Sequence, residues 1–184
     1  MLNITTFLDA NACRLDKTVF YCPERAVSYN SKEILSISPE IARQIQALGV
    51  EKGDRVMLYM NSTPEYLFSY FAVWRLGAVA IPTNRVYTPS ELSYMVENSG
   101  AKVIITDTEG KDSASGLGIS VYVPENIESF RTAEVLPPAN TDFNDLCQLQ
   151  YTSGTTGKPK GAMLTHGNWL AAIHNECDVL TLKQ

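Results

Sequence analysis

Hydrophobic and polar positions along the chain follow two spacings, one typical of strands and one typical of helices. Continuous apolar runs at residues 54–60, 78–82 and 102–107 have the length and composition of buried strands. Segments with helical spacing separate these runs at residues 64–76 and 88–99. Strands and helices that alternate with short connections predict an α/β fold with a parallel sheet.

Capping residues mark the ends of these two helices. Thr63 precedes a proline at the first helical position, and Gly77 ends the helix. Thr88 and Glu91 have the spacing of a capping box, which predicts the start of the second helix. The first helix is apolar on nearly all sides, which indicates burial on more than one face: Tyr66, Leu67, Phe68, Tyr70, Phe71, Val73, Trp74 and Leu76.

The N-terminal part predicts a hairpin and then a broken helix. Residues 18–22 and 26–29 are rich in strand-forming residues and flank a proline-containing turn. The pattern becomes helical at Ser31. Because a residue that precedes proline disfavours the α conformation, we expect a break at Ser38, which would cap a new helix that ends at Gly49.

The C-terminal half predicts less regular structure before a final strand. Residues 109–118 are rich in glycine and serine and predict a mobile loop, and residues 119–123 predict a further strand. Four parts are expected: an N-terminal segment and hairpin (1–30), an α/β subdomain (31–123), a linker (124–145) and a strand, loop, strand and helix (146–184).

The most informative polar segment is LQYTSGTTGKPK, residues 149–160, which lies between two strand-like runs. Glycines let the backbone approach a ligand closely, and consecutive free N–H groups in a turn favour anions. Hydroxyls and lysines add donors and positive charge. The segment predicts a polyphosphate loop, whereas composition alone also fits a polar turn. Its relevant residues are Thr152, Ser153, Gly154, Thr155, Thr156, Gly157, Lys158 and Lys160.

The spacing of this segment excludes two common nucleotide-binding loops. A Walker A loop needs GxxxxGK[ST] before a helix, but only two residues separate Gly154 from Gly157 here. Pro159 stands at the Ser/Thr position, and strand-like residues follow. The segment also lacks the GxGxxG pattern of dinucleotide-binding folds.

Composition narrows the classes of partner. The 184 residues fit one domain, and the formal net charge of −5 disfavours nucleic acid, which requires a concentrated basic face. The four cysteines are widely spaced, as in a reduced cytosolic protein. No apolar stretch is long enough to span a membrane, and the N-terminus lacks the pattern of a signal peptide. We expect a cytoplasmic protein with no nucleic-acid partner and no transmembrane segment.

Other reactive side chains fit structural roles better than catalytic ones. His166 and His174 are not at the i, i+4 spacing of a metal-binding pair. The aromatic residues at helical spacing on residues 64–76 are typical of a core. Asp142 and Asp145 fit a loop residue and a local cap. The cysteines have no basic neighbour that would indicate a nucleophile, Cys147 and Cys177 included.

The string LQYTSGTTGKPKG followed by AMLTHGN resembles the signature of the adenylate-forming superfamily. This superfamily comprises acyl-CoA synthetases, firefly-luciferase-like enzymes and nonribosomal-peptide adenylation domains. Upstream, LGVEKGDRVMLYMNSTPEYLFSYFAVWRLGAVAIPTNRVYTPSELSYMVENSGAKVIITD resembles the N-terminal subdomain of the same enzymes, in the same order. The resemblance runs from about Val19 to the C-terminus. It implies the parallel-sheet βαβ subdomain of the large N-terminal domain, with a small N-terminal β-hairpin.

The resemblance also implies a reaction. Such enzymes activate a small-molecule carboxylate with ATP and Mg²⁺ to an acyl adenylate and then usually form a thioester with coenzyme A. The PKGAMLTHGN segment resembles the acyl-CoA synthetase branch, which implies a fatty acid substrate. Lys158 falls at a variable position of the signature. The residues implied to hold the β- and γ-phosphates are Thr152, Ser153, Gly154, Thr155, Thr156 and Lys160.

The remaining family motifs would lie downstream. Those for the acyl pocket, adenine, ribose, magnesium and the hinge do not occur before Gln184, nor does the catalytic lysine of the C-terminal domain. The chain resembles the first third of a ligase, and we expect it to be inactive alone, with exposed apolar surface that favours self-association. The alternatives are a free-standing nucleotide-binding or interaction module without catalysis, and part of a peptide-synthetase-type adenylation domain.

Overall fold

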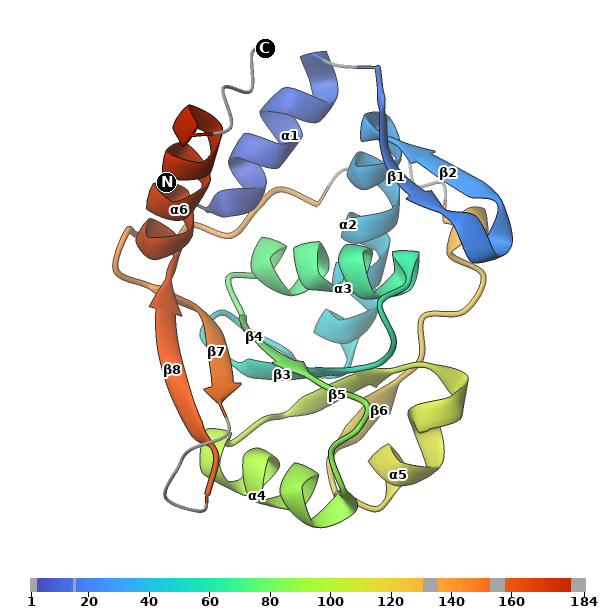
Figure 1. The fold of residues 1–184 in the computed structure, drawn as a ribbon, viewed down its shortest axis with the longest axis vertical. Coiled ribbons are helices and arrows are strands. Elements are labelled where there is room, and N and C mark those ends of the chain that lie inside the picture. The colour runs from blue at the N-terminus through green and yellow to red at the C-terminus, as the bar shows by residue number, and fades with distance from the viewer. Residues whose placement is uncertain (1–2, 15, 131–135, 153–157, 180–184) are drawn as a thin grey trace.

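Six strands form one sheet with helices on both faces (Figure 1). The computed structural model describes residues 3–14, 16–130, 136–152 and 158–179. The strand order is β6-β5-β3-β4-β7-β8, and a separate hairpin contains β1 and β2. The predicted α/β fold with an N-terminal hairpin is confirmed.

The strands are β1 (Thr18–Cys22), β2 (Val27–Asn30), β3 (Arg55–Tyr59), β4 (Val79–Thr83), β5 (Val103–Thr106), β6 (Ser120–Tyr122), β7 (Leu146–Thr152) and β8 (Lys160–Thr165). The α-helices are α1 (Ile4–Arg14), α2 (Ser31–Ala47), α3 (Pro64–Arg75), α4 (Pro89–Ser99), α5 (Lys111–Ser115) and α6 (His166–Val179). Short 3-10 turns are η1 (Pro23–Arg25), η2 (Thr108–Gly110) and η3 (Ile127–Ser129).

The sheet is parallel except at one edge. Strands β6, β5, β3, β4 and β7 run in the same direction. The last strand, β8, returns antiparallel to β7, because the segment between them is too short for a parallel crossover. The predicted parallel sheet therefore holds for five strands, and the predicted phosphate loop joins the two antiparallel ones.

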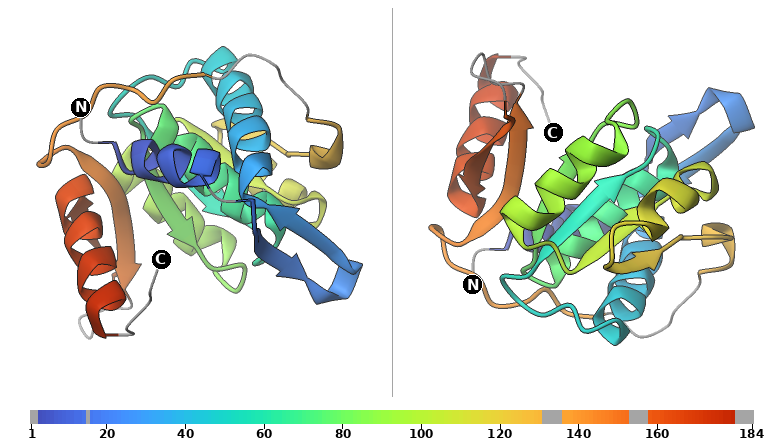
Figure 2. Two further views of the ribbon diagram at one scale, coloured as in Figure 1. Left: turned by 90° about the horizontal axis from the view of Figure 1, so that it is seen from above. Right: turned by 90° about the horizontal axis from the view of Figure 1, so that it is seen from below.

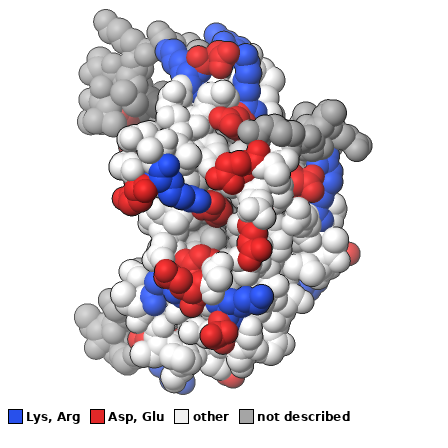
Figure 3. All heavy atoms as spheres, turned by 90° about the vertical axis from the view of Figure 1, so that its right-hand side faces the viewer, with Lys and Arg blue, Asp and Glu red and all other residues white. Residues whose placement is uncertain are grey.

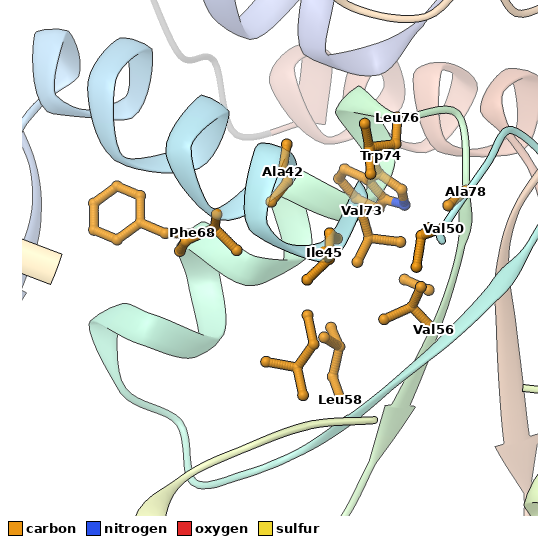
Figure 4. Packing of buried hydrophobic residues seen from close by; sticks show 14 of the residues in the cluster. Ala42, Ile45, Val50, Val56, Leu58, Phe68, Val73, Trp74, Leu76 and Ala78 are labelled. Atoms are coloured by element: carbon orange, nitrogen blue, oxygen red, sulfur yellow. The ribbon is translucent and has the colours of Figure 1, made fainter. Parts of the chain in front are cut away.

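Alternate residues of the buried strands enter two different cores. Val56 and Leu58 of β3 pack beneath α2 and α3 (Figure 4), whereas Met57 and Tyr59 pack against α4 and α5 on the opposite face. The views from above and below show the resulting layers of helix, sheet and helix (Figure 2). Burial on both faces explains why the strands are continuous apolar runs in the sequence. Within the described ranges, no helix is long and apolar enough to cross a membrane.

Helix α1 was not predicted, because its sequence carries few apolar residues at regular spacing. Tertiary contacts hold it instead. The Asn3 amide donates to the carbonyl oxygen of Trp74 at 2.7 Å, and Asp9 accepts two hydrogen bonds from Arg75. The helix therefore depends on α3 for much of its stability.

The predicted helix break at Ser38 is wrong, because α2 runs unbroken through Pro39. Proline within a helix costs about 3 kcal/mol, since it removes one backbone hydrogen bond and crowds the preceding turn. On the same helix Ile37, Ile41 and Ile45 are fully buried. At about 1.5–3 kcal/mol each, their burial contributes more than the proline costs.

The predicted mobile loop at residues 109–118 is also wrong, because the segment contains the end of η2 and helix α5. Asp107 accepts a hydrogen bond from the backbone N–H of Gly110 at 2.8 Å, which caps the first turn. Ala114 then packs in the core beneath the sheet. The cap and the buried Ala114 methyl group stabilise the helical conformation more than the glycines and serines of the segment disfavour it.

Candidate functional site

The β7–β8 hairpin carries the predicted phosphate loop at its tip. Thr152 ends β7 and lies directly opposite Lys160, which begins β8, and both side chains are exposed. The structure thus brings these two predicted site residues together. The other four lie outside the described residues: Ser153, Gly154, Thr155 and Thr156.

Helix α4 supports the hairpin close to its tip. The Tyr151 hydroxyl donates to Asn98 Oδ1 at 2.6 Å, and the Tyr94 hydroxyl donates to the carbonyl oxygen of Pro159 at 3.3 Å. Gly161 lies opposite Tyr151, and a Cβ at this glycine would approach the tyrosine ring to 3.3 Å. The close approach explains why a small residue stands here, and the contacts fix both strands against a helix.

Two lysines place positive charge at this end of the hairpin. The Lys158 ammonium lies 5.1 Å from the centre of the Tyr94 ring, in a cation–π contact. Lys160, two residues later, begins β8 opposite Thr152. An exposed ammonium group opposite an exposed hydroxyl can bind an anion, because both supply donors that rotate to suit its oxygens.

The base of the hairpin meets a group of aromatic side chains that sequence reasoning assigned to the core. Trp74 is buried, and its indole N–H donates to the carbonyl oxygen of Cys147 at 2.9 Å. Tyr66 and Tyr70, however, are only partly buried. Together with Trp169 they line a cleft of about 460 Å³ between α1, α3 and α6. Of the aromatic side chains on α3, Trp74 therefore belongs to the core, whereas Tyr66 and Tyr70 form part of the cleft wall.

Gln148 connects this cleft to the hairpin, and sequence reasoning missed it. Its Oε1 accepts hydrogen bonds from the Tyr70 hydroxyl at 2.5 Å and from the Trp169 indole at 2.9 Å. Its amide nitrogen donates to Gln150 Oε1 at 2.8 Å. Two glutamines that alternate with apolar residues in β7 were the signal available in the sequence. The hydrogen bonds fix Gln148, four residues before the tip, in one orientation.

A second cleft of about 520 Å³ lies at the carboxyl ends of β3 and β5. The chain leaves these adjacent strands in opposite directions, and such points commonly bind ligands in α/β sheets. Acidic side chains lie on this side of the molecule, interspersed with basic ones (Figure 3). The Asp107 carboxylate has a structural role, because it accepts hydrogen bonds from the backbone N–H groups of Asn61 and Gly110 at 3.0 and 2.8 Å. Across the described ranges no group of three or more His, Cys, Asp or Glu side chains could hold a metal ion.

Among the described side chains that were interpreted as structural, His166 and Cys147 are buried and Asp145 caps a local turn. His166 is buried, its Nδ1 accepts from the backbone N–H of Ile4 at 3.4 Å, and burial lowers its pKa. Burial raises the pKa of the Cys147 thiol to about 12, which disfavours a nucleophilic thiolate. Asp145 accepts from the backbone N–H of Asp142 at 3.0 Å, and a hydrogen bond from Lys52 lowers its pKa.

Comparison with known proteins finds relatives over most of the chain. The AMP-binding enzyme family matches residues 7–182. The chain is 33% identical over 163 residues to 4-coumarate–CoA ligase 3 of Oryza sativa subsp. japonica, which covers 82% of this chain and 29% of that protein. It is 38% identical over 129 residues to feruloyl-CoA synthase of Amycolatopsis sp., covering 70% of this chain and 26% of that protein.

Solved structures of similar fold are also much longer. ATP-bound MatB from Rhodopseudomonas palustris superposes with a TM-score of 0.77 at 27% identity, over 93% of this chain and 37% of that chain. Apo MatB gives a TM-score of 0.81 at 25% identity, over 96% of this chain and 38% of that chain. The chain spans less than a third of the length of the two curated relatives.

Proposed function

Because the chain belongs to the AMP-binding enzyme family, we propose that it forms the N-terminal part of an AMP-forming acyl-CoA ligase, with the β7–β8 hairpin as its ATP phosphate loop. The residues proposed to hold the β- and γ-phosphates are Thr152, Ser153, Gly154, Thr155, Thr156 and Lys160. The activity of the whole enzyme is part of the proposal, since relatives of this family are about three times as long.

One observation carries the proposal: the pairing of Thr152 with Lys160 across the hairpin. The pairing places a hydroxyl donor and an ammonium group on adjacent strands at one tip, and α4 supports both strands. Negative charge develops on pyrophosphate as it leaves the α-phosphorus. Donors that are already in place when this charge develops stabilise the transition state without reorganisation.

The cofactors fit the described residues to different degrees. Thr152 and Lys160 suit the phosphate oxygens of ATP, because both are exposed and both donate. The described residues include no cluster of three metal-ligating side chains, so we assign no ligand for Mg²⁺ and derive no step through it. Coenzyme A belongs to the proposed second step, the formation of the thioester.

The identity of the carboxylic acid is the least constrained part of the proposal. The segment PKGAMLTHGN favours a fatty acid. Two relatives are named for coumarate and ferulate, which makes an aromatic acid the second candidate. The relatives named here are CoA ligases, and they favour this branch over peptide-synthetase adenylation domains.

Calorimetric titration with MgATP tests the role of the loop. We expect the chain alone to bind MgATP with a Kd on the order of 1 mM, since most of the nucleotide's contacts would be missing. Lys160→Ala should weaken binding roughly fivefold, as expected for loss of about 1 kcal/mol from an exposed ion pair. Lys158→Ala is the matched control, because it removes the same charge two residues away, and its binding should change less than twofold.

Tripolyphosphate and AMP separate the phosphate site from an adenosine site. Tripolyphosphate should compete with MgATP and AMP should not, because the proposed contacts are to the β- and γ-phosphates. Equal losses of MgATP affinity in Lys160→Ala and Lys158→Ala would indicate that the hairpin attracts ATP only through its overall positive charge, without a specific site at Lys160. Carboxylate-dependent ATP–pyrophosphate exchange by this chain alone would refute the proposal that the activity requires further polypeptide.

A further inference from the structure

The tip of the β7–β8 hairpin lies beyond the point at which β7 pairs with the rest of the sheet. Ala80 and Gln148 form the register pair that joins β4 to β7, whereas β3 and β4 pair over five residues. Pro82, two residues further along β4, has no N–H group to donate to a neighbouring strand. The last part of β7, residues 149–152, therefore needs side-chain contacts to fix its position relative to the core.

Helix α4 supplies such contacts from one of its faces (Figure 1). Tyr94 and Asn98 are four residues apart, which places them next to each other on the same side of the helix. The Tyr94 hydroxyl donates to the carbonyl oxygen of Pro159 at 3.3 Å. Asn98 Oδ1 accepts from the Tyr151 hydroxyl at 2.6 Å. The two contacts hold the strand that enters the tip and the segment that leaves it.

Helix α4 is itself fixed at both ends and on its opposite face. A capping box closes its first turn. At its last turn, the Arg55 guanidinium donates to the carbonyl oxygens of Ser99 and Gly100 at 2.7 and 2.8 Å. Leu92 and Met95 are fully buried in the core beneath the sheet. A group held against such an element is placed more precisely than one on a free loop.

We propose that Tyr94 and Asn98 are positioning residues of the phosphate loop, which hold Thr152 and Lys160 in place for the phosphates of ATP. The inference rests on the proposed function of the hairpin. Donors that are fixed before charge develops need no reorganisation, and a displacement of about 1 Å can cost a hundredfold in rate. Neither tyrosine nor asparagine needs to touch the nucleotide to have this effect.

Each contact lies one residue from a proposed phosphate-binding side chain. Tyr151 directly precedes Thr152 on β7, and Pro159 directly precedes Lys160 at the start of β8. Movement of either contact residue therefore shifts the neighbouring donor. Both partners of each contact are described residues of this chain, so no further polypeptide is needed to form them.

The same geometry gives the two lysines different roles. The Lys158 ammonium lies over the Tyr94 ring, whereas Lys160 lies opposite Thr152 across the hairpin. Tyr94→Phe keeps an aromatic ring beneath Lys158 and removes only the hydroxyl group. This variant therefore isolates the hydrogen bond to Pro159 from the cation–π contact.

Hydrogen exchange of the full 184-residue chain measures how firmly the hairpin is held. Tyr94→Phe combined with Asn98→Ala should speed exchange in residues 160–165 about tenfold, as expected for the loss of two ordinary hydrogen bonds. Exchange in β5 and β6 should keep its wild-type rate, because neither strand contacts the substituted groups. Asn98→Asp should retain wild-type exchange in the hairpin, since its carboxylate still accepts from Tyr151.

A second tyrosine provides the matched control for loss of a hydroxyl group. Tyr122→Phe removes a 2.7 Å hydrogen bond to Gln44 Oε1 at the other edge of the sheet. Exchange in residues 160–165 should be unchanged in this variant. The comparison separates a local effect of α4 from a general loss of stability.

Titration with MgATP then tests the positioning role. The double variant Tyr94→Phe, Asn98→Ala should weaken binding about fivefold, because the phosphate-binding donors remain but are no longer held in place. In a Lys160→Ala background the same two substitutions should cost less than twofold. Residues that act through one group have effects that do not add.

The possible outcomes separate the inference from the proposed function. Wild-type exchange in the hairpin of the double variant would overturn the inference, as would faster exchange with wild-type affinity for MgATP. A full fivefold loss in the Lys160→Ala background would also overturn it, because the effect would not act through Lys160. A wild-type chain that binds no MgATP would instead contradict the phosphate loop itself, and the inference would fail with it.

Discussion

The ion pair between Arg75 and Asp9 gives the sharpest test of how the N-terminal helix is held. The Arg75 side chain is fully buried, and its two terminal nitrogens lie 2.5 and 3.0 Å from the two carboxylate oxygens of Asp9. The guanidinium also donates to the carbonyl oxygen of Leu136 at 2.8 Å. Removal of the Asp9 carboxylate leaves a buried positive charge with a single neutral acceptor.

The expected cost follows from this geometry. Breaking a buried pair by removing one partner typically costs about 3–5 kcal/mol. Because the Asp9 side chain is 19% exposed, water can reach the site in the variant, and we expect a cost of about 2–3 kcal/mol for Asp9→Ala. A loss of this size is a large fraction of the total stability of a typical domain, about 5–15 kcal/mol.

Urea unfolding followed by fluorescence measures this cost. Trp74 and Trp169 are the two tryptophans of the chain. Their rings lie 5.2 Å apart, with Trp74 buried and Trp169 packed against the edge of the core, so the signal reports on tertiary structure. Asp16→Ala is the control. It breaks the 2.7 Å pair with Lys32, in which both side chains are more than half exposed, and should cost about 0.5 kcal/mol or less.

A double variant shows whether the loss of stability comes from the unpaired charge of Arg75 or from lost packing. Asp9→Leu combined with Arg75→Met removes both charges and should recover most of the stability, since replacement of a buried pair by apolar residues is often neutral. Equal small losses for Asp9→Ala and Asp16→Ala would refute the reasoning. So would a double variant that is less stable than Asp9→Ala.

Two further predictions concern buried groups elsewhere in the fold. Because burial lowers the pKa of His166, the unfolded state binds more protons than the folded state as the pH falls below the ordinary histidine pKa of about 6.5. The free energy of unfolding should therefore fall as the pH drops through this range, and His166→Gln should flatten that slope in urea titrations. Gly110→Ala should cost about 1–3 kcal/mol, because the new Cβ would lie 2.5 Å from Arg85 Nη1 and closer still to Thr106 Oγ1. Gly116→Ala, whose Cβ would meet its nearest neighbour at 4.0 Å, should be neutral or slightly stabilising in the same melts, and equal losses at the two glycines would contradict the packing argument.

The sequence by itself determined the elements whose signals are local. Buried strands such as β3 are continuous apolar runs, and the box of Thr88 and Glu91 fixed the start of α4 within one residue. Thr63 likewise caps α3 as predicted. Strands β7 and β8 were also predictable, because two apolar runs flank a segment rich in glycine, serine and threonine, which are turn residues.

Only the tertiary structure decided the elements whose stability comes from distant partners. Helix α1 forms because Asp9 meets a buried arginine 66 residues away, which no local pattern reveals. Helix α2 continues through Pro39 because the isoleucines on both sides of the proline share one core. At the site, the same principle holds: Gln148 acquires its role from Tyr70 and Trp169, which the fold brings to it from two other elements. Local chemistry specified where strands and caps lie, and long-range burial specified which weak signals became structure.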